Sequence, residues 1–137
     1  MRNFRALFFA FAATTLVFTA CSPVNRVTKR LSGDWEITNY EERKLDKPGF
    51  ASTYIGTLTL NPDQTGTRRL SYDSWGAAVN DTTSFTWVNT ENIVTIKSQG
   101  DEETKTWIII ALKRHKLKWK STDGAGNVQV MMMKRLK

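Results

Sequence analysis

Cysteine and histidine are almost absent from this sequence, which holds one residue of each, Cys21 and His115. A single cysteine excludes a disulfide within the chain. A zinc or other transition-metal centre needs several convergent side-chain ligands, and His115 has no second histidine and no second cysteine to share an ion with. We therefore expect no metal and no other cofactor.

Catalytic signatures are missing as well. The chain contains no Gly-x-Ser-x-Gly turn and no phosphate-binding loop. Acidic residues that folding could pair, such as Asp73 with Asp81 or Glu102 with Glu103, lie in or next to segments that we interpret as loops. The sequence therefore predicts a protein that is not an enzyme.

Helical periodicity is hard to find, and alternation of apolar and polar residues dominates instead. It predicts eight strands, at residues 34–40, 53–60, 66–72, 82–88, 92–97, 103–112, 116–120 and 128–135. Many short strands separated by turn signals indicate an all-β fold, and eight of them suffice to close a barrel. We predict an eight-stranded antiparallel up-and-down β-barrel.

The expected connections between these strands differ in length. Four longer segments, 41–52, 73–81, 98–102 and 121–127, would all lie at one end of an up-and-down barrel. The three shorter connections would lie at the other end. This asymmetry predicts a cup that is closed by tight turns and has a mouth ringed by long loops.

The N-terminal segment has the pattern of a targeting signal. Arg2 and Arg5 precede fifteen uncharged residues, 6–20, which are too few to span a bilayer comfortably. The segment ends in Phe-Thr-Ala before Cys21 and resembles the bacterial lipobox, which implies removal of residues 1–20 and lipidation of Cys21. An uncleaved anchor helix is the alternative.

The segment after Cys21 is polar, and we interpret residues 21–30 as the lipidated cysteine and an extended tether to a domain at residues 31–137. By its resemblance to other lipoproteins, Ser22 favours anchoring to the outer membrane, facing the periplasm. Basic residues in the tether would touch anionic headgroups, or the tether is a plain solvated linker.

The domain begins with Gly33-x-Trp35 and continues with GTLTLNPDQTGT at residues 56–67. This pattern resembles the lipocalin-like domains of bacterial lipoproteins. The resemblance implies that Trp35 seals the closed end and stacks near a basic residue of the last strand, Arg135 or its neighbour Lys134. Avidin-type barrels also begin with Gly-x-Trp, so that topology stays open.

Aromatic side chains provide the candidate ligand site. Strand alternation places some of them inside the barrel near the mouth, and two others in the long loops over it. The six candidates are Phe50, Tyr54, Tyr72, Trp75, Trp107 and Trp119. They would bind a small hydrophobic or amphipathic molecule through apolar contact and stacking. The alternative is that they simply fill the core. The same alternation places Met132 inward.

The strand at residues 103–112 is apolar on both faces. Ile108, Ile110 and Leu112 would point outward, and we expect other parts of the chain to cover them, with an interface to an envelope protein as the alternative. Lysines alternate along 116–120, but Trp119 lies on the opposite face, which argues against nucleic-acid binding. A solvated strand face explains them, with a weak attraction to anionic lipid as the other possibility.

The sequence therefore predicts a membrane-anchored protein that binds or shuttles a small molecule at the cell envelope. The alternative is a filled barrel that serves as an accessory subunit of an envelope complex.

Overall fold

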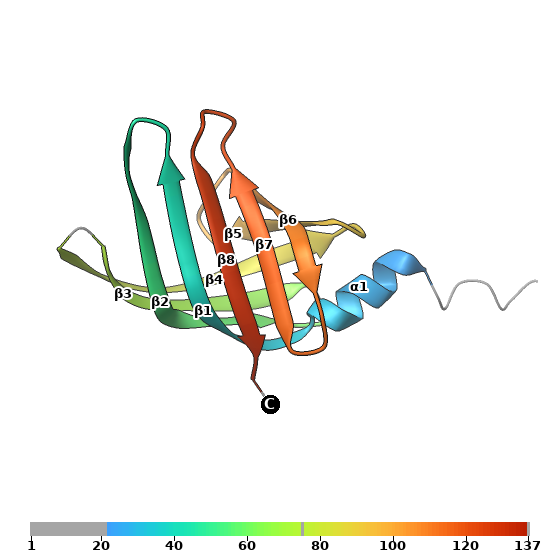
Figure 1. Ribbon diagram of the computed structural model, residues 1–137. Helices are drawn as coiled ribbons and strands as arrows, with labels where there is room; N and C mark the ends of the chain where they lie inside the picture. The colour runs from blue at the N-terminus through green and yellow to red at the C-terminus, as the bar shows by residue number, and fades with distance from the viewer. Residues whose placement is uncertain (1–21, 75, 137) are drawn as a thin grey trace, which may run out of the picture.

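The computed structural model describes residues 22–74 and 76–136, which form one helix and eight strands (Figure 1). In chain order these are α1 (Pro23–Leu31), β1 (Gly33–Lys44), β2 (Lys47–Leu60), β3 (Thr65–Ser74), β4 (Ala77–Asn89), β5 (Ile93–Ser98), β6 (Lys105–Leu112), β7 (Lys116–Thr122) and β8 (Val128–Arg135).

The strands form a closed barrel in which each strand pairs antiparallel with the next. The first and last strands complete the circle, with a register that runs from Trp35 opposite Arg135 to Arg43 opposite Val128. The predicted eight-stranded antiparallel up-and-down β-barrel is confirmed. Because β1 and β8 pair with each other, neither of them is left as an exposed sheet edge where they pair.

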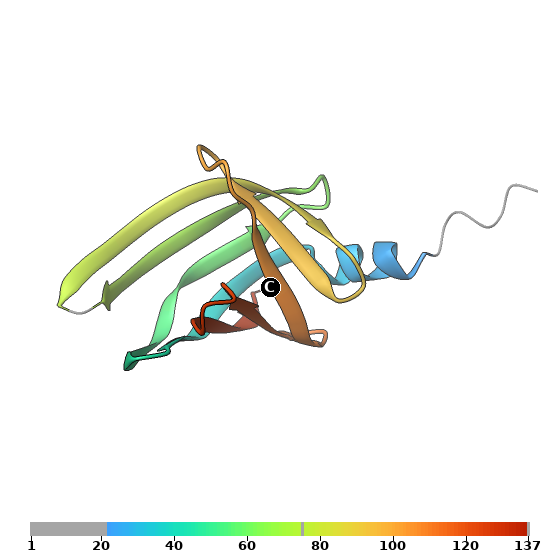
Figure 2. The same cartoon turned by 90° about the horizontal axis from the view of Figure 1, so that it is seen from above.

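The strands at the open end are longer than the sequence predicts. The expected long loop at 41–52 is mostly paired ladder, because Glu42 lies opposite Phe50 and only Leu45 and Asp46 remain between the strands. The expected loop at 73–81 is likewise part of the β3–β4 ladder. The prediction of two long loops folded over the mouth is therefore wrong. These segments are hairpins that project from the barrel (Figures 1 and 2).

The two projecting hairpins separate from each other. Pairing between β2 and β3 extends from Leu60 opposite Gly66 to Gly56 opposite Leu70 and then stops. Beyond that point the β1–β2 and β3–β4 hairpins diverge, as Figure 1 shows. The backbone ladder between β2 and β3 is therefore complete at the closed end and absent at the open end.

The core is made of inward-facing side chains from every strand. Three of the fully buried residues are tryptophans, Trp35, Trp87 and Trp119. On β3, β4, β5 and β7 inward and outward residues alternate regularly, as expected for strands with one buried face. The inward residues on these four strands are Leu70, Tyr72, Phe85, Trp87, Val94, Ile96, Leu117 and Trp119.

The predicted side-chain directions are wrong on β8 and at Tyr54 of β2. Met131 and Met133 are buried, so Met132 lies on the outer face of β8. Tyr54 is 69% exposed, because β2 carries an irregularity where it pairs with β1. There Tyr54 adopts a φ of 52° and Ile55 turns inward in its place. Alternation counted along a strand fails wherever an extra residue is inserted.

The segment that we interpret as an extended tether is instead helical from Pro23 to Leu31. Ser22 caps α1 by accepting a hydrogen bond from the Asn25 N–H at 3.1 Å, and proline occupies the first helical turn. The buried side chain of Leu31 joins α1 to the barrel core. Within residues 22–74 and 76–136, no helix has the length and apolar character needed to cross a bilayer.

The outer face of β6 remains open to solvent. Ile108 is 38% exposed and Ile110 is 50% exposed, so the prediction that the chain itself covers them is wrong. Leu112 differs, because it is half-buried and packs against the core. A register shift between Ile109 and Ala111 changes the alternation just before it.

Candidate functional site

A cavity of about 350 Å³ opens inside the barrel at the end where the hairpins project. Its lining combines apolar and charged side chains from six of the eight strands. They are Tyr40, Glu42, Ile55, Arg68, Leu70, Tyr72, Val79, Asp81, Lys105, Trp107, Gln129 and Met131. We call this cavity the cup.

Aromatic rings form one side of the cup. Tyr72 lies with its ring centroid 5.8 Å from that of Phe50 and 6.2 Å from that of Tyr40. Deeper in the barrel Trp107 stacks on Trp119, with centroids 5.3 Å apart and an angle of 23° between the planes. Such separations suit aromatic pairs, so the rings are held in fixed positions.

Four of the six predicted ligand residues thus fall into two ring clusters, Phe50 with Tyr72 and Trp107 with Trp119. Tyr72 and Trp107 line the cup directly. Phe50 lies in β2 and not in a loop. Tyr54 points outward and has no place in the site. Trp75, like Cys21, lies outside the residues that the structure describes.

A polar network links β1, β6 and β8 inside the cup. The Tyr40 hydroxyl donates to Glu42 Oε1, and the Gln129 amide donates to both Tyr40 (2.9 Å) and Glu42 (3.3 Å). The Lys105 ammonium donates to Gln129 Oε1 and lies 4.8 Å from the centre of the Trp107 ring. The network therefore holds one cation and one carboxylate against an aromatic wall.

A second charged group enters from β3 and β4. Arg68 Nη2 forms an ion pair with Asp81 at 3.0 Å, and the Thr83 hydroxyl donates to the other oxygen of Asp81 at 2.7 Å. The Nε of Arg68 is buried and has no hydrogen-bond partner among the described residues. Inside the barrel the indole N–H of Trp119 is in the same condition. Two buried donors thus lack acceptors among residues 22–74 and 76–136.

Three titratable groups of the cup, Lys105, Asp81 and Tyr40, have shifted pKa values. Burial lowers the pKa of the Lys105 ammonium, and the positive charge of Arg68 lowers it further. The hydrogen bond from Thr83, followed by that from Arg68, lowers the pKa of Asp81. Burial raises the pKa of the Tyr40 phenol, and its hydrogen bond to Glu42 acts in the same direction. The cup therefore keeps Tyr40 neutral and Asp81 ionised near neutral pH.

The Tyr40 phenol makes stability sensitive to alkali. Because its pKa is raised in the folded state, the folded chain holds a proton that the unfolded chain loses above about pH 10. We expect the free energy of unfolding to fall as pH rises above 10, by up to about 1.4 kcal/mol per pH unit. Urea titrations at pH 8 to 11.5 would measure this slope.

The matched variant is Tyr40→Phe, which removes the phenol but keeps the ring. In this variant the free energy of unfolding should fall less steeply above pH 10. The remaining fall would come from Tyr72, because burial raises the pKa of that phenol as well. The lowered pKa of Lys105 has the opposite effect, because it makes the free energy of unfolding rise with pH, and only below the unfolded pKa of about 10.5. Lys105 therefore does not contribute to a loss of stability above that pH. An equal slope in both proteins would contradict the assignment.

The closed end is sealed around Trp35. Its indole N–H donates to the Leu31 carbonyl at 2.8 Å, and the Arg135 guanidinium lies over its ring, 4.2 Å from the centroid. Arg135 also donates to the carbonyls of Ser32 (2.8 Å), Arg30 and Arg114 (2.7 Å). The guanidinium therefore binds α1, β1 and the β6–β7 turn together.

Sequence reasoning missed the charged part of the cup. The signal was available, because Arg68 has the same strand parity as Leu70 and Tyr72, and Lys105 has the parity of Trp107. A charged residue at an inward position is unusual in a small barrel. Gln129 was hidden by the incorrect parity of β8, since it lies on the inward side with Met131.

Fold and cup together define a small β-barrel with one closed end and one open, lined end. The sequence matches the lipocalin-like domain family over residues 31–119, so the chain belongs to this family. Barrels of this type typically hold one small hydrophobic ligand.

Solved structures agree with this fold. A lipocalin-like protein from Bacteroides uniformis is 11% identical, with a TM-score of 0.55, and the match covers 78% of this chain and 99% of that one. An uncharacterized protein from Bacteroides eggerthii is 9% identical, with a TM-score of 0.50, and the match covers 74% and 97% of the two chains. No curated protein matches the sequence.

Proposed function

We propose that this protein binds a small amphipathic molecule in the cup, with the polar end of the ligand at Arg68 and Lys105. The apolar part of the ligand would lie against Tyr72 and Trp107. No catalytic step and no cofactor belong to this proposal.

The observation that carries the proposal is the charged lining of the cup. A filled core is expected to be apolar, since each buried charge costs free energy unless it is fully paired. Here two cations and two carboxylates line the interior beside aromatic rings, and Arg68 Nε has no acceptor among the described residues. An acceptor on a ligand, such as a carboxylate oxygen, would complete the hydrogen bonding of this guanidinium.

The size of the cup also favours a small ligand. Ligand pockets in proteins measure roughly 300–1,000 Å³, and the cup lies at the lower end of that range. A longer molecule would have to extend out of the open end of the barrel.

We further propose that the protein is a lipoprotein of the cell envelope. Residues 1–20 would be a cleaved signal peptide, and acyl chains on Cys21 would hold the barrel at the outer membrane, facing the periplasm. Sequence alone supports this part of the proposal. Two or more acyl chains suffice for stable anchoring, at about 0.8 kcal/mol for each buried CH₂.

The test uses laurate and dodecanol, which share an apolar chain and differ in the polar group. Binding to the purified full chain would be followed by tryptophan fluorescence, because Trp107 lines the cup. We expect laurate to bind more tightly than dodecanol. Arg68→Gln should weaken laurate binding by roughly 10- to 100-fold, the value of a hydrogen bond to a charged group, and leave dodecanol nearly unchanged.

Arg69→Gln is the matched control, because Arg69 is the exposed neighbour on the outer side of the same strand. It should bind both probes like the unmodified chain. Equal losses in the two variants, or no response to either probe, would contradict a ligand site at Arg68. Native mass spectrometry of the chain purified from its host would identify a co-purified ligand.

A second candidate function is an accessory subunit of an envelope complex. The exposed Ile108 and Ile110 on β6 favour it, because they offer an apolar contact to a partner. Leu112, which was expected to contribute, is half-buried against the core. This candidate predicts that neither probe binds and that Ile110→Ser releases a co-purified protein.

A further inference from the structure

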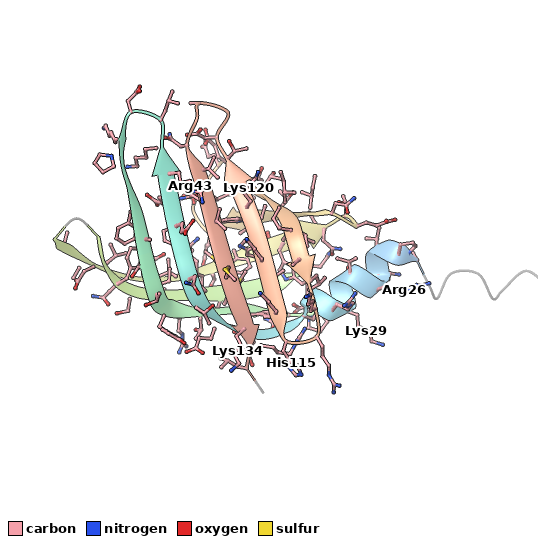
Figure 3. The ribbon with its side chains drawn as sticks, in the orientation of Figure 1. Arg26, Lys29, Arg43, His115, Lys120 and Lys134 are labelled. Carbon is pink, nitrogen blue, oxygen red and sulfur yellow. The ribbon has the colours of Figure 1, made fainter. Side chains whose placement is uncertain are left out.

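A positively charged surface lies outside the barrel, on the strands that complete the closure. Alternation on β7 places Lys116, Lys118 and Lys120 outward, because Leu117, Trp119 and Ser121 are buried. Lys134 projects on the same side from β8, between the buried Met133 and the partly buried Arg135. We call these four lysines the basic face, and Figure 3 shows two of them, Lys120 and Lys134, with His115 at the turn.

The strand register brings like charges together on this face. Lys116 lies directly opposite Lys134 across the β7–β8 ladder. Directly opposed like charges destabilise a sheet. None of the four lysines has an ion-pair partner within residues 22–74 and 76–136. An external anion would relieve this repulsion. The repulsion itself contributes nothing favourable to the folding of the barrel.

Apolar side chains lie between the lysines. Val130 is opposite Lys120, and Met132 is opposite Lys118. Together with the exposed Ile110 they line an outer groove of about 420 Å³. Basic residues around an apolar strip are the composition that binds the interface of an anionic bilayer, since the apolar groups enter the headgroup region and the lysine ammonium groups reach the phosphates.

Carboxylates are few around the basic face. Glu36 lies opposite Lys134 on the neighbouring strand, and Glu41 is already paired with Arg43 at 3.2 Å. Arg26 and Lys29 add exposed positive charge on α1, off to the side of the basic face (Figure 3). The surface is therefore complementary to phosphate-rich headgroups.

The position of α1 relates this surface to the chain that precedes it. Pro23, the first residue of α1, is only two positions after Cys21. The helix is fixed to the barrel, because Arg30 donates to the Leu112 carbonyl at 3.1 Å and Thr28 bonds to Asn89 at 2.6 Å. A short connection to a fixed helix leaves little freedom to turn the barrel relative to an anchor at Cys21.

We propose that the basic face docks on an anionic membrane surface, so that the barrel lies against the bilayer along β7 and β8. The inference uses the proposed anchoring at Cys21 to bring the face to the membrane, and it is independent of ligand binding in the cup. The occupant is the phospholipid headgroup layer with its negative charge, which the lysines recognise as phosphate.

The experiment measures which side of the barrel touches lipid. The full chain would be reconstituted in phosphatidylcholine vesicles that contain a quencher lipid. The vesicles would be prepared with or without 30% phosphatidylglycerol (about one lipid in three). A fluorophore would be attached at Asn39→Cys, an exposed position in the outer groove, or at Thr86→Cys on β4. β4 is the strand farthest from β8 around the barrel.

We expect quenching at position 39 to rise several-fold when phosphatidylglycerol is present. It should fall in about 0.5 M salt, because the screening length is already only ~10 Å at about 0.1 M and is shorter still at this concentration. Position 86 should change little. Lys118→Gln with Lys120→Gln should lower the ratio of docked to undocked chains by roughly 30-fold, from about fivefold for each lost charge. Arg69→Gln with Lys97→Gln removes the same charge from other exposed strand positions and should leave docking intact.

Equal quenching at positions 39 and 86, or quenching that ignores phosphatidylglycerol and salt, would overturn the proposal. Self-association that protects position 39 without lipid would also overturn it, in favour of a second copy on this face. Thiol labelling of the unsubstituted chain tests the anchor separately, because an acylated Cys21 takes up no label. With an unacylated Cys21, flotation of the chain with vesicles would still report docking by the same lysines.

Discussion

Replacing Trp35 with alanine is expected to lower the free energy of unfolding by about 4–5 kcal/mol. Truncation of a fully buried tryptophan costs about 3–5 kcal/mol through lost burial and the cavity that remains. The change also leaves the Leu31 carbonyl without its donor and removes the ring beneath Arg135. Small domains are stable by only about 5–15 kcal/mol, so much of the total would be lost. Urea denaturation followed by circular dichroism would measure it.

Trp35→Phe separates burial from hydrogen bonding at the same position. Phenylalanine keeps an aromatic face for the Arg135 guanidinium but cannot donate to the Leu31 carbonyl. We expect a loss of about 2 kcal/mol, from a smaller side chain and one unsatisfied buried carbonyl. A Trp35→Ala cost below about 1.5 kcal/mol would contradict the role of this residue as the seal of the closed end.

Gly56→Ala is expected to be about as damaging, at roughly 3–5 kcal/mol. Gly56 has a φ of +155°, which side-chain-bearing residues rarely adopt, and a Cβ placed there would lie 1.8 Å from the Arg69 carbonyl oxygen. That oxygen belongs to the backbone of the next strand and cannot move without breaking the β2–β3 ladder. Backbone strain and the clash would each cost about 1–3 kcal/mol. Thermal denaturation would detect the loss.

Gly100→Ala is the matched control, since Gly100 also has a positive φ (+88°) but nothing lies within 4 Å of its added Cβ. It should cost only the backbone strain, about 1–2 kcal/mol. If Gly56→Ala is no worse than Gly100→Ala, the close approach of β2 to Arg69 does not limit stability.

The barrel could be predicted from the sequence because burial on one face of each strand leaves a simple alternating pattern. That pattern is clear on β4, β5 and β7, where Trp87, Val94 and Trp119 are all inward. It failed at Tyr54 and Met132, because a local insertion or a run of three methionines hides the parity. The ends of the hairpins were missed since residues 41–52 are polar, although backbone pairing alone is enough to continue a ladder.

The cup was only half predictable. Aromatic residues such as Tyr72 and Trp107 stand out by type and parity alone. The pairing of Arg68 with Asp81 depends on the register of two neighbouring strands, and that of Lys105 with Gln129 joins β6 and β8 across the intervening β7. Helix α1 was missed for a related reason, because the Ser22-Pro23 start signal was outweighed by the polar composition of the segment.

The seam between β1 and β8 has a consequence for the way the chain folds. All other strand pairs join neighbours in the sequence, whereas Trp35 and Arg135 are 100 positions apart (35 and 135). Hairpins between adjacent strands form with little loss of chain entropy, but the seam must restrict nearly the whole domain. We therefore expect barrel closure to be the slow step of folding, completed when the Trp35 ring meets the Arg135 guanidinium. Substitutions at this seam would therefore alter how fast the protein reaches its native state as well as how stable that state is.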